Sequence, residues 1–220
     1  VAVPAANVVE LPGGLPFEQG AIIGCAVATS FHAAKIAEVS LGEDVAVFGL
    51  GGVGSHAVQW AKLRGARNII GIDVVRKKLE FAKGFGATHA IDPLSEDAAK
   101  AISEITQGKG VEVAMDFAGQ PASLNSAINS AARGGRVVII GRGPREIPIS
   151  PWAFLRRELQ MRTSSDHLRN EVPAIVEQVR AGRMDLSRSI TARLPLESAN
   201  EGLDALEKHG SEHLRIVVMP

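Results

Sequence analysis

The chain has 220 residues, which is long for one ordinary domain and short for two full ones. Its 24 basic and 24 acidic side chains balance, so no net field favours nucleic acid or a membrane surface, and we expect neither partner. The single cysteine excludes an internal disulfide, and with no long apolar run and no signal-peptide pattern the sequence predicts a cytoplasmic protein.

In chain order, residues 1–8 read like a strand entering a loop and no methionine precedes them, so we expect the natural beginning to lie further upstream. A predicted helix covers residues 17–39. Short β-rich runs then alternate with helical patterns. The predicted strands cover 45–48, 69–73, 89–92, 111–116, 137–140 and 159–164. The predicted helices cover 53–63, 76–85, 97–106, 122–132 and 172–181. A strand (190–194), a helix (196–208) and a strand (214–219) end the chain.

The most informative motif is VAVFGLGGVG at residues 45–54, where a predicted strand runs into Gly49-x-Gly51-x-x-Gly54. The first glycine permits a tight turn, the second lets backbone approach a pyrophosphate, and the third lets the next helix pack closely. Free N–H groups at the start of that helix then face the phosphates. Asp73 follows Gly54 by nineteen residues and ends the second predicted strand, where it can accept hydrogen bonds from ribose hydroxyls. The motif predicts a dinucleotide site formed by Asp73 and the turn residues Gly49, Leu50, Gly51, Gly52, Val53 and Gly54.

Apolar strands separated by helices imply a parallel sheet that is covered on both sides. The repeated β-α-β order predicts an α/β protein with a Rossmann doubly wound six-stranded parallel sheet and helices on both faces. We expect three segments: a lead-in over 1–40, the dinucleotide-binding Rossmann domain over 41–185, and a strand–helix–strand tail over 186–220.

Several blocks of this sequence resemble the medium-chain dehydrogenase/reductase family, in its zinc-type alcohol dehydrogenase branch. They include GCAVATSFHAAK (24–35), VFGLGGVG (47–54), GVEVAMDFAG (110–119) and LPLESANEGLDALEKHGSEHLRIVV (194–218). The resemblance covers nearly the whole chain and implies the cofactor-binding domain followed by the C-terminal tail. It also implies that the family's N-terminal catalytic domain is absent from this sequence.

The resemblance implies further site residues but no catalytic residue. Cys25 matches the family's third zinc-ligand position; zinc needs three or four protein ligands, so we expect a free thiol and no zinc in this chain. Lys78 matches a basic residue near the adenosine ribose, although a solvated lysine stays open. Arg215 matches an arginine that reaches the pyrophosphate, which suits guanidinium chemistry. Three residues lie at the C-terminal ends of the fourth and fifth predicted strands: Gly119, Ile140 and Gly141. They either border the nicotinamide or form ordinary turns at the strand ends.

The histidines show no spacing typical of a metal site. His32 lies seven residues after Cys25, near the same face of a helix, but a packed or solvated side chain is the expected outcome. The others have no HxxxH or HExxH pattern and are expected to be structural or surface residues: His56, His89, His167, His209 and His213.

The implied function is that of an NAD-dependent alcohol or polyol dehydrogenase, which moves hydride between an alcohol and the nicotinamide. We expect this chain to bind NAD(H), to form a homo-oligomer and to lack turnover alone. A non-catalytic dinucleotide-binding module and a zinc-free quinone-reductase-like member of the family stay open. A short-chain dehydrogenase is excluded because the chain has no tyrosine. A methyltransferase is the other alternative, but adenosylmethionine has no pyrophosphate, so the glycine turn and Arg215 would have no ligand.

Overall fold

The computed structural model describes residues 2–208 and 213–220. Its main sheet has six parallel strands in the order β3-β2-β1-β4-β5-β6. The strands are β1 Asp44–Phe48, β2 Asn68–Ile72, β3 His89–Ile91, β4 Val111–Asp116, β5 Ala131–Ile139 and β6 Gln160–Thr163. This order is that of a dinucleotide-binding Rossmann sheet, which confirms the predicted fold.

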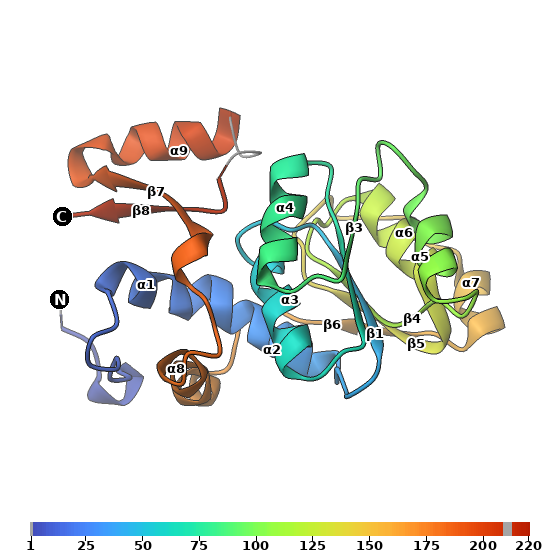
Figure 1. Ribbon diagram of the computed structural model, residues 1–220, viewed down its shortest axis with the longest axis horizontal. Helices are drawn as coiled ribbons and strands as arrows, with labels where there is room; N and C mark the ends of the chain where they lie inside the picture. The colour runs from blue at the N-terminus through green and yellow to red at the C-terminus, as the bar shows by residue number, and fades with distance from the viewer. Residues whose placement is uncertain (1, 209–212) are drawn as a thin grey trace.

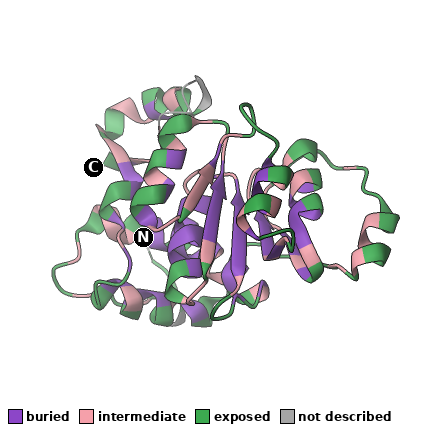
Figure 2. Cartoon of the chain, turned by 45° about the vertical axis from the view of Figure 1, so that its right-hand side comes forward, coloured by how far each residue is buried: buried purple, intermediate pink, exposed green. Residues whose placement is uncertain are grey.

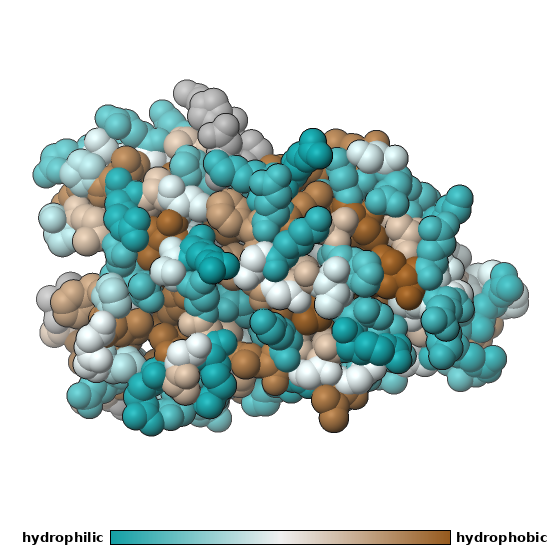
Figure 3. All heavy atoms as spheres, in the orientation of Figure 1, coloured by the Kyte–Doolittle hydropathy of each residue, from teal (hydrophilic) through white to brown (hydrophobic). Residues whose placement is uncertain are grey.

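Helices cover both faces of the sheet (Figure 1). One layer contains α2 Ala28–Ile36, α3 Gly54–Leu63, α4 Arg76–Phe85 and α8 Val172–Arg180. The opposite layer contains α5 Ala98–Ile105 and α6 Pro121–Ser130. Alternate residues of β1 serve the two layers, because Val45 and Val47 join the first apolar cluster while Ala46 and Phe48 join the second. The central strands are therefore buried on both faces (Figure 2). Hydrophilic side chains cover much of the face of the molecule shown in Figure 3.

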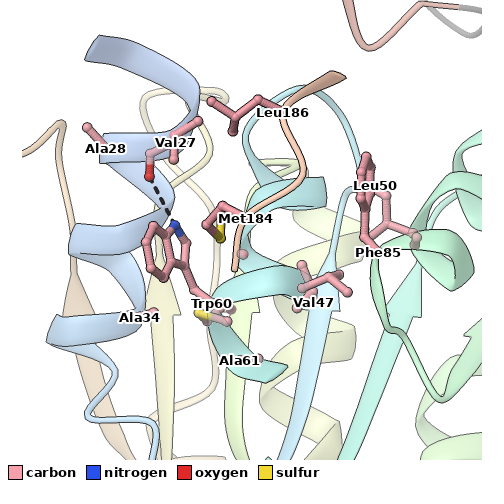
Figure 4. Packing of buried hydrophobic residues seen from close by; sticks show 14 of the residues in the cluster. Val27, Ala28, Ala34, Val47, Leu50, Trp60, Ala61, Phe85, Met184 and Leu186 are labelled. Atoms are coloured by element: carbon pink, nitrogen blue, oxygen red, sulfur yellow. Dashed lines mark hydrogen bonds between the residues drawn. The ribbon is translucent and has the colours of Figure 1, made fainter. Parts of the chain in front are cut away.

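The predicted helix over 17–39 is found, but with a different interior and end. It consists of α1 Phe17–Ile22, a π-helical turn Ile23–Val27, and α2, which ends at Ile36. Two side chains donate to the Val27 carbonyl at the end of the π turn. The Ser30 hydroxyl donates at 2.9 Å, and the Trp60 indole N–H donates at 3.1 Å, as Figure 4 shows. The wide turn thus gives a donor on α3 access to the lead-in helix.

The sequence prediction was wrong about two elements near β5. The strand begins at Ala131, directly after α6, and bulges between the pairs Val111–Ala131 and Val113–Arg136. Gly134 adopts a φ of 73° there, which favours glycine. The second element is the short helix α7 Pro151–Arg157, which was not predicted and buries none of its residues.

The tail forms its own two-stranded parallel sheet, from β7 Ile190–Pro195 and β8 Arg215–Met219. Helix α9 Ala199–Lys208 connects them and lies above them in Figure 1. Five short helical turns complete the described structure: Ala5–Asn7, Arg169–Glu171, Ser187–Ser189, Leu196–Ser198 and the π turn above.

One apolar core joins residues of all three predicted segments. Ile23 and Val27 of the lead-in, Val47 of the main sheet, and Leu214 and Val217 of the tail belong to the same cluster. The division into 1–40, 41–185 and 186–220 stays a prediction. Over residues 2–208 and 213–220, no helix is both long and apolar enough to cross a membrane.

Candidate dinucleotide-binding site

The glycine turn lies between β1 and α3, and its glycines are needed for close approach. Gly49 has a φ of 87°, and a Cβ there would lie 2.8 Å from the Ala118 backbone nitrogen. A Cβ on Gly54 would collide with the Gly49 carbonyl oxygen, so only glycine lets α3 start this near the strand. At Gly51, by contrast, a Cβ would meet nothing within 4 Å. The Gly51 side of the turn is therefore open to an approaching ligand.

Asp73 directly follows β2 and has a structural task as well as its predicted binding role. One carboxylate oxygen accepts the Leu50 N–H at 2.7 Å, and the other accepts the Val75 N–H at 2.9 Å. The acid therefore ties the glycine turn to the end of β2. Each oxygen keeps a further lone pair for a ribose hydroxyl.

A cavity of about 330 Å³ lies beside this acid, at the carboxyl ends of the strands. Its lining includes Asp73, Gly49, Ile72, Val74, Pro93 and Gln120. The carboxyl edge of an open parallel sheet is where ligands of doubly wound folds bind. Lys78, in the first turn of α4, is half-buried near this edge.

Arg215, the first residue of β8, packs against the other side of the glycine turn. A Cβ on Gly52 would collide with the Arg215 guanidinium and would lie 2.7 Å from the Leu214 carbonyl oxygen. The Arg215 Nε atom is buried and has no hydrogen-bond partner among the described residues. A buried, unsatisfied guanidinium N–H beside a helix start fits a phosphate oxygen of a ligand. The structure thus brings together the turn, Asp73 and Arg215 from three distant parts of the chain.

The three predicted nicotinamide-side residues form one joined turn region beyond β4 and β5. The Asp116 carbonyl accepts the N–H groups of Ile140 at 2.9 Å and Gly141 at 2.8 Å. Gly119 has a φ of 66°, and a Cβ on it would lie 2.7 Å from the Gly141 carbonyl carbon. Both glycines are therefore required by the contact between the two strand ends.

Asp116 is a site-edge residue that the sequence analysis missed. One of its side-chain oxygens accepts from Ser123 Oγ at 2.9 Å and from two N–H groups, those of Ala118 and Gly119. The other oxygen is buried without a partner. Burial raises the pKa of Asp116, and the hydrogen bonds from Ser123, Gly119 and Ala118 offset only part of that rise. Its signal is an acid that ends a strand three residues before a glycine.

Cys25 is exposed on the π turn, as a free thiol. His32 does not form a site with Cys25. Its Nδ1 atom instead lies 3.0 Å from Oε2 of Glu171, and the other carboxylate oxygen of Glu171, Oε1, accepts from Lys35 at 2.9 Å. Burial alone would raise the pKa of Glu171, but hydrogen bonds from Leu168 N–H, Lys35 and His32 outweigh it and hold that pKa below its ordinary value.

A four-coordinate zinc needs at least three protein ligands. Over the described ranges, no group of three or more His, Cys, Asp or Glu side chains could hold a metal ion. These residues by themselves do not fit a zinc centre, although Cys25 is accessible to complete one. His209 lies outside the described residues.

Comparison with known proteins agrees with this geometry. The family model for zinc-binding dehydrogenases matches residues 52–181. The chain belongs to the zinc-binding dehydrogenase family. Sorbitol dehydrogenase of Bacillus subtilis is 33% identical over 96% of this chain and 59% of its own length. An alcohol dehydrogenase of Geobacillus stearothermophilus is 34% identical over 96% of this chain and 60% of its own length.

Solved structures of family members superpose closely on this zinc-binding dehydrogenase chain. The alcohol dehydrogenase of Thermus sp. ATN1 has a TM-score of 0.90 and 27% identity, over 99% of this chain and 63% of that one. A zinc-binding dehydrogenase of Sinorhizobium meliloti 1021, bound to NADP, has a TM-score of 0.87 and 28% identity, over 96% of this chain and 62% of that one. The chain thus spans about 60% of the length of these relatives.

Proposed function

We propose that this chain binds NAD(H) and acts as the cofactor-binding part of a dehydrogenase that transfers hydride between an alcohol or polyol and the nicotinamide. The observation that carries the proposal is the unsatisfied Arg215 Nε against Gly52, across the glycine turn from Asp73. The similarity to sorbitol and alcohol dehydrogenases supports the substrate class. We also propose that copies of the chain associate through the exposed β6 edge.

Each residue group has one task in this proposal. The first N–H groups of α3 and the Arg215 guanidinium bind the pyrophosphate. Asp73 binds the ribose hydroxyls, with Lys78 beside them. Gly119, Ile140 and Gly141 border the nicotinamide, since they lie at the carboxyl ends of β4 and β5.

Zinc in a dehydrogenase polarises the substrate oxygen as a Lewis acid. The described residues offer Cys25 but no group of three ligands, so we assign no zinc-dependent step to them. We propose that the 220-residue chain alone binds cofactor without oxidising alcohols. Metal analysis and absorbance of NADH check this: stoichiometric zinc together with steady NADH formation from an alcohol would contradict it.

The preference for NAD(H) over NADP(H) follows from Asp73, whose charge repels a 2′-phosphate. Calorimetry should show NAD⁺ binding at least about tenfold more tightly, which corresponds to ~1.4 kcal/mol. Asp73→Gly should narrow that ratio and weaken NAD⁺ binding, because Leu50 N–H also loses its acceptor. Asp97→Gly is the matched control, since Asp97 caps α5. Equal or tighter binding of NADP⁺ by the unaltered chain would refute the assignment.

A further inference from the structure

A buried histidine on α3 connects the cofactor helix to the tail. His56 is fully buried, and its Nε2 atom lies 3.0 Å from the Ser189 hydroxyl oxygen. Its Nδ1 atom lies 3.3 Å from the side-chain nitrogen of Gln59, one turn further along α3. Because an amide nitrogen only donates, Nδ1 must accept and Nε2 must carry the proton that is donated to Ser189.

Gln59 completes this contact with the same stretch of chain. Its side-chain nitrogen donates to the Asp185 carbonyl at 2.9 Å, and its side-chain oxygen accepts the Asp185 N–H at 2.9 Å. Met184 and Leu186 flank Asp185 and pack in the apolar core near Trp60 (Figure 4). Two side chains of α3 therefore fix the chain that leads into β7.

The contact leads directly to Arg215. Ile190 follows Ser189 and pairs with Arg215 in the parallel ladder of β7 and β8. The Thr191 hydroxyl stabilises this pairing of the two strands, since it donates to the Arg215 carbonyl at 3.0 Å and accepts the Leu214 N–H at 3.1 Å. Leu214 and Arg215 in turn lie against Gly52, four residues before His56. The helix that starts at the phosphate site thus holds, through the tail, the arginine that completes this site.

We propose that His56 and Ser189 form a positioning pair that holds Arg215 on the glycine turn and so sets the affinity for the pyrophosphate of the cofactor. This inference rests on the proposed function. Neither residue contacts the ligand in this proposal; both act through β7 and β8. A merely structural role would instead lower stability and leave the contribution of Arg215 to binding unchanged.

The test measures binding of ADP-ribose to the 220-residue chain by calorimetry. Ser189→Ala removes the acceptor for His56 and should weaken binding about threefold to tenfold. Ser187→Ala is the matched control, because Ser187 lies in the same short turn and its hydroxyl donates to Asp185 Oδ1 at 2.7 Å, with no hydrogen bond to a side chain of α3. Adenosine, which has no phosphate, should bind equally to all variants. A second variant, His56→Gln, keeps a donor and should retain more affinity than His56→Leu.

A double-mutant cycle shows whether the pair acts through Arg215. In a chain that already carries Arg215→Ala, the further substitution Ser189→Ala should leave the affinity for ADP-ribose unchanged. Additive losses, or unchanged ADP-ribose affinity in Ser189→Ala, would overturn the positioning role while the cofactor-binding proposal stands. If the unaltered chain binds no ADP-ribose, the proposed function fails and this inference fails with it.

Discussion

His56 makes stability depend on pH in a way that one substitution can isolate. Burial lowers its pKa to about 3, with a further lowering from the Arg215 charge and an opposing effect of Asp185. The unfolded chain has an ordinary histidine with a pKa near 6.5, so below that pH it binds the proton that the folded chain does not. The contribution of the buried, neutral His56 to the free energy of unfolding is therefore complete above about pH 6.5, and it is lost as the pH falls towards 3.

Urea unfolding at a series of pH values measures this effect. Relative to His56→Gln, the free energy of unfolding of the unaltered chain should fall by up to about 1.4 kcal/mol per pH unit below pH 6. Carboxylates titrate in both proteins and cancel in the difference. A His56→Gln curve that runs parallel to the curve of the unaltered chain would show that this imidazole is not held neutral.

Residues whose role is local could be predicted from the sequence, and residues whose partners are distant could not. The conformation of Gly49 follows from a turn of a few residues, and the sequence motif describes that turn. The Ser189 contact of His56 spans 133 residues, and the Glu171 contact of His32 spans 139. No local pattern relates such pairs. The hydrogen bonds that Asp73 accepts from the Leu50 and Val75 N–H groups were also missed. The motif predicts a ligand for this carboxylate, but it does not show that the same carboxylate also accepts from the backbone.

At the scale of elements, the helix–helix contact between α2 and α3 depends on Trp60. Its indole is buried, donates to Val27 and lies edge-on to Phe31 with ring centroids 4.9 Å apart. Trp60→Phe should lower the free energy of unfolding by about 1–2 kcal/mol, since it removes one hydrogen bond and part of the packed area. The Val27 carbonyl keeps the Ser30 hydroxyl as a donor, which limits the loss.

The chain has a matched control for this prediction, because Trp152 on α7 is 62% exposed. At protein concentrations too low for association, Trp152→Phe should change the stability of the single chain by less than about 0.5 kcal/mol. Urea titration followed by circular dichroism compares the two variants without depending on tryptophan emission. Equal stabilities of the two variants would mean that the α2–α3 contact contributes little.

Element types were predictable where the hydrophobic period was clear, and less so where other forces decide. The five strands that precede α7 were expected from apolar runs bounded by glycines. The start of β5 was not, because Arg133 and the two glycines after it interrupt the apolar pattern while the backbone continues to pair with β4. Helix α7 has only seven residues, and none of them is fully buried, although Ala153 and Phe154 pack against the second apolar cluster. So short a segment shows no clear helical period. The π turn makes a hydrogen bond with a donor on another helix, a contact that no local pattern reveals.

At the scale of the molecule, the crossover rule explains why the doubly wound parallel sheet was predictable. In a parallel sheet with helices on both faces, the order in which successive strands are added reverses at one point, and β1 and β4 are neighbours there. The position of Arg215 within this site depends on the tail returning to α3. Only the family resemblance pointed to that return, because the tail forms a separate sheet and its strands pair with each other.

The β6 edge of the main sheet gives the last prediction, which is self-association. This strand ends the sheet order, so one side of its backbone has no neighbouring strand within the described part of the chain. Next to it in sequence, α7 exposes Trp152 and Leu155, the latter at 69%. Unpaired backbone and exposed apolar side chains together favour a second copy at this edge. Light scattering at tens of micromolar should therefore give a mass above that of one chain.

Leu155→Lys should shift this equilibrium towards the monomer, because a charge would be buried at the contact. Leu203→Lys is the matched control: Leu203 is 65% exposed on α9, at the opposite end of the molecule (Figure 1). It should leave the mass unchanged. A monomeric mass for the unaltered chain, or equal effects of the two lysines, would place any association on another surface.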